Sequence, residues 1–249
     1  MSPPSTAAAR RHTLRALLLV ALGGLIVFSL ALAGVILGGR LAPLDEPAIL
    51  VADDVARALP RSAVIGITEL GALPTTAAVV TAAALVLVAR GRTRAAASLA
   101  LGFLVVVTTV RLVKVGVERP RPPGHDPGLT TPSFPSAHAA YSTAWLAVAL
   151  ALTRLGGVTR VRTRTRRAAI VVTLTLTLAI AASRPVLDAH YLSDVVGGWG
   201  LAASVFGLVG ALMLAIGPMR HTRLEDGRRP APERTGPAST AMPPGRRTR

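Results

Sequence analysis

The chain has 249 residues, of which 51% are hydrophobic and 16% charged, and it contains no cysteine, which excludes disulfide bonds and thiolate chemistry. Its net charge of +16 would suit a nucleic-acid-binding protein. The basic residues, however, gather in tails and short loops between long apolar runs. This distribution is typical of a membrane protein and predicts no nucleic-acid partner.

Long runs rich in Ala, Leu and Val predict an all-α fold, a polytopic membrane helical bundle with six transmembrane helices. We expect spans at residues 14–37, 74–89, 95–117, 138–155, 168–182 and 194–216. The alternation of Thr and Leu in 173–178 resembles a strand, but an open strand leaves backbone groups unpaired in lipid, so a helix is favoured.

The segments outside these runs are polar. Residues 39–61 predict a loop that could carry a short interfacial helix. Residues 1–13 and 217–249 predict disordered basic tails, because they are rich in polar residues, Arg and Pro without periodicity. The chain is therefore expected to hold one membrane domain, residues 14–216, between two tails.

Basic residues are divided unequally between the two sides of the expected bundle. With six spans, the two tails, Arg15 at the start of the first span, the 90–94 turn and the 154–167 loop share one side and hold 20 arginines against three acidic residues. The other side and the span ends hold 8 basic and 9 acidic residues. Since positive charge stays in the cytoplasm, we predict cytoplasmic termini and place the 118–137 and 183–193 loops outside.

Several charged residues lie between the last two apolar runs, where a lipid-embedded chain should avoid them. His190 and Asp194 are spaced i, i+4 and would share one face of a helix. A carboxylate beside an imidazole fixes its tautomer and raises its basicity, which suits a nucleophile or general base. Arg184 supplies a planar fork of donors that fits phosphate oxygens.

Two further clusters fall on the same expected side. Lys114, the only lysine, stands six residues before Arg121-Pro122 and could meet a phosphate as a compact charge. Pro135-Ser136-Ala137-His138 opens the fourth span, where Ser136 could cap a helix whose N-terminus favours an anion. Taken alone, Lys114 could be a snorkelling lysine, although a lone lysine in an arginine-rich chain favours a functional role. The second cluster alone would favour a capped helix with an incidental histidine.

Together the three clusters resemble the signature of the type 2 phosphatidic acid phosphatase family, also called lipid phosphate phosphatases. The family pattern is Lys-x6-Arg-Pro, then Pro-Ser-Gly-His, then Ser-Arg-x5-His-x3-Asp. The chain matches it in order from Lys114 to Asp194, with one departure: Ala137 stands where the family has glycine. Because helical dihedrals suit alanine, we expect this change to be tolerated.

The resemblance implies a role for each matched residue. His190 would attack phosphorus and form a phosphohistidine, Asp194 would orient it, and His138 would protonate the leaving group and then activate water. The phosphate-binding groups would be Lys114, Arg121, Ser136, Ala137 and Arg184. No metal or other cofactor would be needed, since cationic side chains take its place. Five nearby residues could tune the site or the choice of substrate, but ordinary loop or interface roles are favoured for each: Arg111, Arg119, His125, Asp126 and Asp188.

The expected function is hydrolysis of a lipid phosphate or pyrophosphate at the outer face of the membrane. Polyprenyl pyrophosphate is the first choice of substrate, with phosphatidic acid and phosphatidylglycerophosphate as alternatives. A transporter lined by these polar groups would not explain why all three motifs meet on one side. A non-catalytic scaffold is disfavoured because both histidines and Asp194 are present. A vanadate haloperoxidase is disfavoured because those relatives are soluble.

Overall fold

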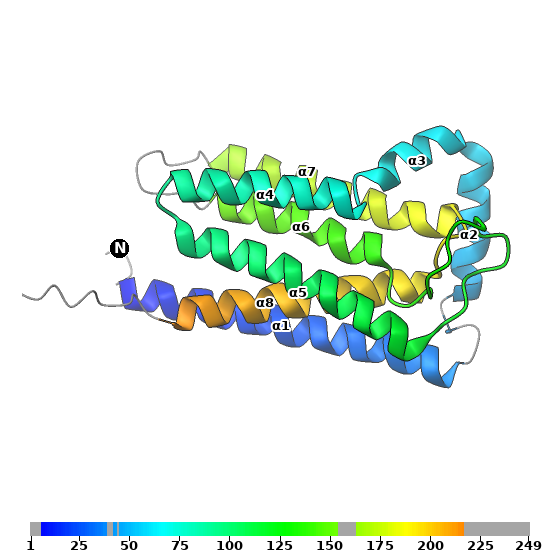
Figure 1. Cartoon of the computed structure of the whole chain (residues 1–249), viewed down its shortest axis with the longest axis horizontal. Coiled ribbons are helices and arrows are strands. Elements are labelled where there is room, and N and C mark those ends of the chain that lie inside the picture. The colour runs from blue at the N-terminus through cyan, green and yellow to red at the C-terminus, as the bar shows by residue number, and fades with distance from the viewer. Residues whose placement is uncertain (1–5, 39–41, 44, 154–162, 217–249) are drawn as a thin grey trace, which may run out of the picture. The chain divides into compact units, whose positions relative to one another are not determined.

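The computed structural model describes residues 6–38, 42–43, 45–153 and 163–216, and all its regular elements are helices (Figure 1). The prediction of an all-α fold is confirmed. The helices are α1 (Thr6–Leu37), α2 (Asp45–Ala58), α3 (Arg61–Glu69), α4 (Leu73–Ala89), α5 (Thr93–Val117), α6 (Ala137–Thr153), α7 (Thr163–Val186) and α8 (Leu192–Ala215). The long helices run side by side, and α2 lies across one end of the bundle.

Length and composition make this a multi-pass membrane protein. Four helices, α1, α5, α7 and α8, are long and apolar enough to cross a membrane. The pair α3 and α4 passes the same test as one span bent by 41°, with Pro74 in the first turn of α4. The apolar helix α6 has 17 residues and is shorter than those four helices. The described chain thus shows four or five clear spans, and the predicted number of six is not confirmed.

Helix α1 packs against α8 through glycines that allow their backbones to approach closely. A Cβ atom added at Gly24 would lie 2.4 Å from the backbone nitrogen of Ser204, and one at Gly200 would lie 2.5 Å from that of Phe28. Small residues at such contacts replace the hydrophobic driving force that is missing between helices in lipid. This packing fixes α1 against the helix that carries Asp194.

The first helix corrects the predicted N-terminal tail. It begins at Thr6 rather than at residue 14, so residues 6–13 are helical and not disordered. Alanine and arginine favour helices, and Arg10 donates hydrogen bonds to the carbonyls of Leu214 (2.7 Å) and Ala215 (3.1 Å) on α8. Residues 1–5 and the predicted tail 217–249 lie outside the described residues.

Helix α7 is longer than predicted at its C-terminal end. It runs to Val186, so Ser183 and Arg184 occupy its last turn and not a loop. Pro185, which has no N–H to donate, lies in this last turn, and Asp188 then turns the chain with a φ of 52°. The Thr/Leu alternation near residue 175 is helical, as predicted.

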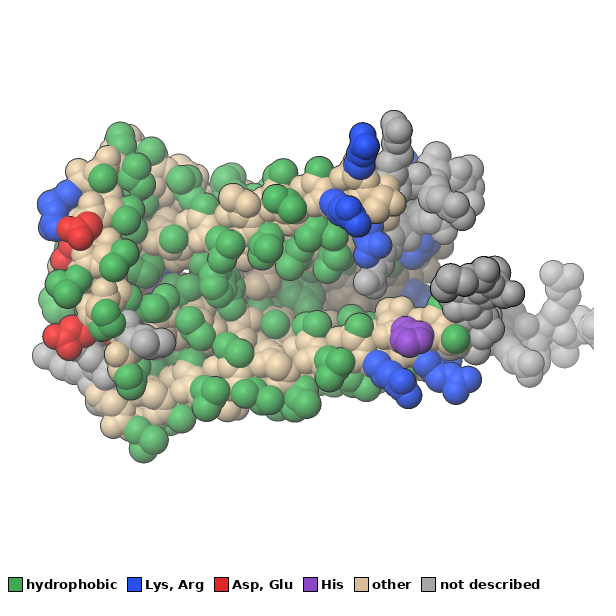
Figure 2. Space-filling model, turned by 180° about the vertical axis from the view of Figure 1, so that it is seen from behind, with side chains coloured by type: hydrophobic (Ala, Val, Ile, Leu, Met, Phe, Trp, Pro, Cys, Tyr) green, Lys and Arg blue, Asp and Glu red, His purple; other side chains and the backbone are tan. Residues whose placement is uncertain are grey.

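The two ends of the bundle differ in chemistry. The C-terminal ends of α5 and α7 meet the N-terminal ends of α6 and α8 beside α2 (Figure 1). On the face in Figure 2, apolar side chains cover the middle, most of the basic side chains gather at one end, and the acidic side chains lie at the other. The three predicted motif clusters therefore come to the same end of the molecule, opposite the arginine-rich 90–94 turn.

Candidate active site

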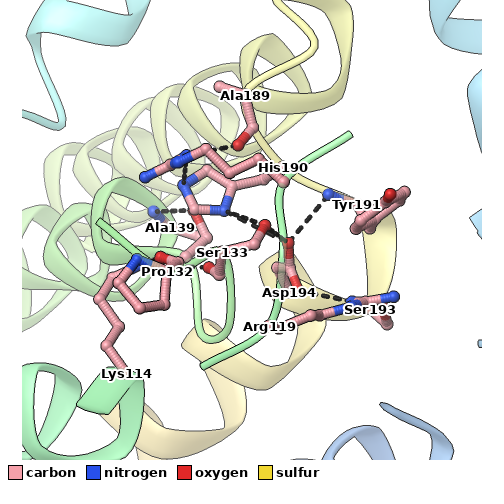
Figure 3. A network of polar contacts seen from close by, with 12 residues as sticks. Lys114, Arg119, Pro132, Ser133, Ala139, Ala189, His190, Tyr191, Ser193 and Asp194 are labelled. Atoms are coloured by element: carbon pink, nitrogen blue, oxygen red, sulfur yellow. Dashed lines mark hydrogen bonds and ion pairs between the residues drawn. The ribbon is translucent and has the colours of Figure 1, made fainter. Parts of the chain in front are cut away.

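His190 and Asp194 form a buried pair at the start of α8. The His190 ring is 3% exposed, Asp194 is fully buried, and Nδ1 lies 3.3 Å from Oδ2 (Figure 3). The expectation that both share a helix face is wrong, because His190 lies before the helix, in residues 187–191. Asp194 reaches back from the first turn to accept a hydrogen bond from the Tyr191 amide at 3.0 Å. This cap fixes the carboxylate beneath the imidazole.

Two side chains that sequence reasoning left without a catalytic role also hold Asp194. The Ser133 hydroxyl donates to Oδ2, and the Arg119 guanidinium donates to Oδ1 at 2.6 Å. Both residues are buried. The sequence favours a loop role for Arg119 over one in tuning the site, and the Arg-Pro-Arg-Pro repeat at 119–122 is the one signal that could raise its rank. The carboxylate thus has a partner on each oxygen, which stabilises its ionised form.

The environment of His190 favours a neutral ring. Burial lowers the pKa of His190 to about 3, although hydrogen bonding and charge attraction from Asp194 work in the opposite direction. With Nδ1 facing the carboxylate, the proton of the neutral ring belongs on Nδ1 and the lone pair on Nε2. That free nitrogen lies 3.3 Å from Nη1 of Arg121.

Arg121 is fixed at this position by the loop that connects α5 and α6. Its Nε donates to the Thr131 carbonyl at 2.9 Å, and Nη2 donates to the Thr131 hydroxyl at 3.1 Å. Nη1 also donates to the Ala189 carbonyl at 2.5 Å. These bonds hold the guanidinium beside the imidazole and join two segments that are distant in sequence.

Lys114 and Arg184 come from the last turns of α5 and α7. Lys114 is buried, and its Nζ donates to the carbonyls of Pro132 and Ser133, the latter at 3.1 Å. Arg184 donates from Nη1 to the Thr68 hydroxyl on α3 at 2.5 Å. Its Nε is buried and makes no hydrogen bond to the described residues. Such a donor is costly to leave unpaired unless a ligand completes it.

The second predicted cluster lies at the start of α6. His138 is half-buried and interacts electrostatically with the side chains of His190, Arg184, Arg121 and Lys114. The second motif histidine, His138, and the three motif cations therefore lie around one region next to His190.

Ser136 and Ala137 form the turn into this helix. Ser136 is fully buried, its amide donates to the Asp194 carbonyl at 2.9 Å, and its Oγ lies 3.5 Å from the Ala139 amide. The last distance makes it a long helix cap. Ala137 is the first helical residue and is half-buried beside the main apolar cluster. The predicted phosphate-binding turn is therefore tied directly to the helix that carries Asp194.

The structure thus brings all eight predicted site residues to one end of the bundle. The lower-ranked candidates lie elsewhere or serve the loop. Arg111 pairs with Tyr141, His125 contacts the Pro122 carbonyl through Nδ1 at 2.8 Å, and Asp126 accepts a bond from the Gly128 amide. Three residues that the sequence analysis did not single out bind these cations. Asp45 and Ser193 accept hydrogen bonds from Arg119, and Thr68 accepts one from Arg184.

Comparison with known proteins agrees with this geometry. The chain is similar in fold to a transmembrane PAP2-type phosphatidylglycerolphosphate phosphatase from Bacillus subtilis, with a TM-score of 0.65 and 19% sequence identity. The match covers 80% of this chain and 99% of that structure. No curated protein matches the chain. A model of the PAP2 superfamily matches residues 93–217, half of the chain and all three motifs, and the chain therefore belongs to the PAP2 superfamily.

Proposed function

We propose that the chain is a membrane phosphatase that hydrolyses a lipid phosphate or pyrophosphate through a phosphohistidine at His190. The observation that carries this proposal is the orientation of the His190 ring. Nδ1 faces Asp194, while Nε2 faces Arg121 in the region that the other motif cations surround. A neutral imidazole held in this way is an activated nucleophile beside an anion-binding group.

In the first step, the lone pair of Nε2 forms a bond to phosphorus, and the bond from phosphorus to the lipid oxygen breaks. His138, protonated at the start, gives its proton to the leaving oxygen. Asp194 stabilises the positive charge that develops on the His190 ring. The partial negative charge on the phosphoryl oxygens is stabilised by donors that are already in place.

In the second step, water attacks the phosphohistidine. The now neutral His138 accepts a proton from the water, a new P–O bond forms, and the electron pair of the P–N bond returns to Nε2. Inorganic phosphate leaves, His138 is protonated again, and both rings are back in their starting states. The proximity of His138 to His190 supports this double role, whereas the cations around His138, Arg184 among them, oppose its protonation until a bound phosphate anion neutralises them.

The charge balance of the site supports an anionic substrate. Its buried or half-buried groups comprise four cations and two carboxylates, namely Lys114, Arg119, Arg121 and Arg184 with Asp45 and Asp194. The formal excess of two positive charges matches the charge of a phosphate monoester dianion. We therefore infer that the cationic side chains perform the electrostatic role of a metal ion, and that activity persists in EDTA.

We place the site on the outer side of the membrane in a bundle of six spans. This assignment counts α3 with α4 as one span and adds α6 as the sixth. It is supported by 20 arginines, those of the tails and of the 90–94 and 154–167 segments together with Arg15, which would all be cytoplasmic. Because the chain has no cysteine, single cysteines placed at Gly128 and Gly91 would report their sides by labelling with an impermeant maleimide.

For the substrate, we propose a polyprenyl pyrophosphate first and phosphatidic acid or phosphatidylglycerophosphate as alternatives. An outward site and compact loops suit a carrier lipid that presents its pyrophosphate at the outer surface. The motif residues recognise the phosphate, and the apolar surface of the helices would accommodate the tail.

The test is phosphate release by the full chain in detergent from a panel of these three lipids, with EDTA present. The wild-type protein should be active, and His190→Ala should lose activity while keeping its thermal unfolding midpoint. The matched control is His12→Ala, because His12 is exposed on α1 at the opposite end of the bundle. Full activity in His190→Ala would refute the phosphohistidine mechanism, and a metal requirement would refute the role given to the cations.

A further inference from the structure

We propose that Asp45 is a positioning residue that keeps the Asp194 carboxylate directed at His190, acting through Arg119 and Ser193. The inference rests on the proposed function. Asp45 opens α2, outside residues 93–217 that match the family model. Its side chain is fully buried, although it lies in a segment that the sequence describes only as a polar loop.

Among the described residues, the donors around Asp45 belong to groups near the site or to its own turn. Oδ1 accepts a hydrogen bond from the Ser193 amide at 2.9 Å, and Oδ2 accepts one from the Ser193 hydroxyl at 2.8 Å. Oδ2 also accepts from Nη2 of Arg119 at 2.7 Å and from the Ala42 amide at 2.9 Å. With this many hydrogen bonds, the buried Asp45 carboxylate is fixed in position, and it fixes the position of the groups that donate to it.

Arg119 connects Asp45 to the catalytic carboxylate of Asp194. One nitrogen of its guanidinium, Nη2, bonds Asp45, while Nη1 bonds Asp194 Oδ1 at 2.6 Å and Ser193 Oγ at 2.7 Å. The guanidinium carbon lies 4.2 Å from the centre of the Tyr191 ring, which restricts the tilt of the fork (Figure 3). Because the fork is planar, fixing Nη2 also fixes Nη1 and the Asp194 oxygen that it binds.

The charge of Asp45 has a second consequence for the site. Arg119 forms ion pairs with both Asp45 and Asp194, so its attraction to Asp45 opposes its attraction to Asp194. Without that balance, Arg119 would attract Asp194 more strongly and weaken the interaction of Oδ2 with His190. Loss of Asp45 should therefore slow the chemical step and leave the cations that bind phosphate in place.

A purely structural role for Asp45 makes a different prediction. The carboxylate lies in the first turn of α2, where negative charge is favourable, and it links α2 to the α8 terminus. If that were its whole function, its replacement would lower thermal stability without selectively lowering kcat. The kinetic constants and the unfolding midpoint together separate the two roles.

The experiment measures phosphate release from phosphatidic acid in mixed micelles by the full chain. Asp45→Asn should lower kcat by roughly tenfold or more, as expected when a partner that orients a reacting group is removed, with KM changed by less than about twofold. The matched control is Asp54→Asn on the same helix, where the carboxylate pairs with Arg57 on the surface. That variant should behave like the wild type.

A double-variant cycle tests the route through Arg119. In an Arg119→Gln background, which is itself expected to be slow, Asp45→Asn should reduce kcat little further. Effects that multiply independently would overturn the inference, as would an unchanged kcat or a change confined to KM in Asp45→Asn alone.

If Asp45→Asn does not fold, Ser193→Ala tests the inference in its place. This variant removes the hydroxyl between Asp45 and Arg119 and keeps both charges. A selective loss of kcat in Ser193→Ala supports the inference, and wild-type kcat in this variant overturns it. A wild-type protein that releases no phosphate from any lipid of the panel would overturn the proposed function and this inference together. An active wild type with an equally active Asp45→Asn variant would overturn only the inference.

Discussion

Replacing Ser133 with alanine tests whether the hydrogen bonds on Asp194 matter for catalysis. The Ser133 hydroxyl is fully buried, donates to Oδ2 of Asp194 and lies 3.3 Å from Nδ1 of His190. In the contacts of the described residues, this hydroxyl meets both members of the catalytic pair but none of the cationic side chains that would bind the phosphate. The variant should therefore affect the attack by His190 more than the binding of the lipid.

The expected size of the effect follows from the contacts that remain. A hydrogen bond to a charged group contributes about 1.5–3 kcal/mol. After the change, the Tyr191 amide still holds Oδ2 and Arg119 still holds Oδ1, so the lower end of that range applies. A loss of about 1.5 kcal/mol in the transition state corresponds to a kcat roughly tenfold lower. KM should stay within about twofold of the wild-type value.

Steady-state phosphate release and thermal unfolding followed by tryptophan fluorescence would measure both consequences. The control is Ser142→Ala, the same substitution at another fully buried serine, whose hydroxyl donates to the Ala139 carbonyl at 2.8 Å inside α6. It should lose some stability and keep its kcat. If both variants had the same kcat, the order that Ser133 imposes on Asp194 would be irrelevant to the reaction.

Three further outcomes are expected. Arg184→Lys keeps the charge but loses the planar fork, so kcat/KM for a lipid phosphate should fall by roughly tenfold, and an unchanged value would argue against bidentate binding. Ala137→Gly should lower the unfolding midpoint slightly, by up to about 1 kcal/mol of stability, and leave activity within about twofold; a large gain would show that the alanine methyl crowds the phosphate. Below pH 6.5 the unfolded chain protonates His190, whereas the folded chain does so only near its pKa of about 3. The unfolding midpoint should therefore drop as the pH falls from 6.5 toward 3, and His190→Gln should show a shallower drop; equal slopes would contradict the buried neutral ring.

The long apolar helices were predictable because their signal is local and repeated. The third and sixth predicted spans, 95–117 and 194–216, differ from α5 and α8 by two residues or fewer at each end. The motif residues were predictable for a related reason, since their chemistry and spacing are visible without the fold. Their convergence at one end then follows from helices that alternate in direction.

The contacts that order the site were not predictable from the sequence. Arg119 meets Asp45 across 74 positions, and Arg184 meets Thr68 across 116. Aspartate and threonine in a polar segment or near a helix end are too common to indicate such partners. The end of α7 was missed because the predicted span stops with the apolar run at residue 182, whereas the helix continues through Ser183, Arg184 and Pro185 to Val186.

These contacts also show that two regions of the chain contribute to the site in different ways. Residues 93–217, which match the family model, contain every group proposed to touch the phosphate. Buried cations, however, are costly without partners, and two of them find theirs on helices before that region: Arg119 on α2 and Arg184 on α3. Helices α2 and α3 therefore belong to the site physically, although they carry none of its motifs. It follows that exchanging residues 45–69 for an unrelated amphipathic segment should impair the site even if the bundle still assembles.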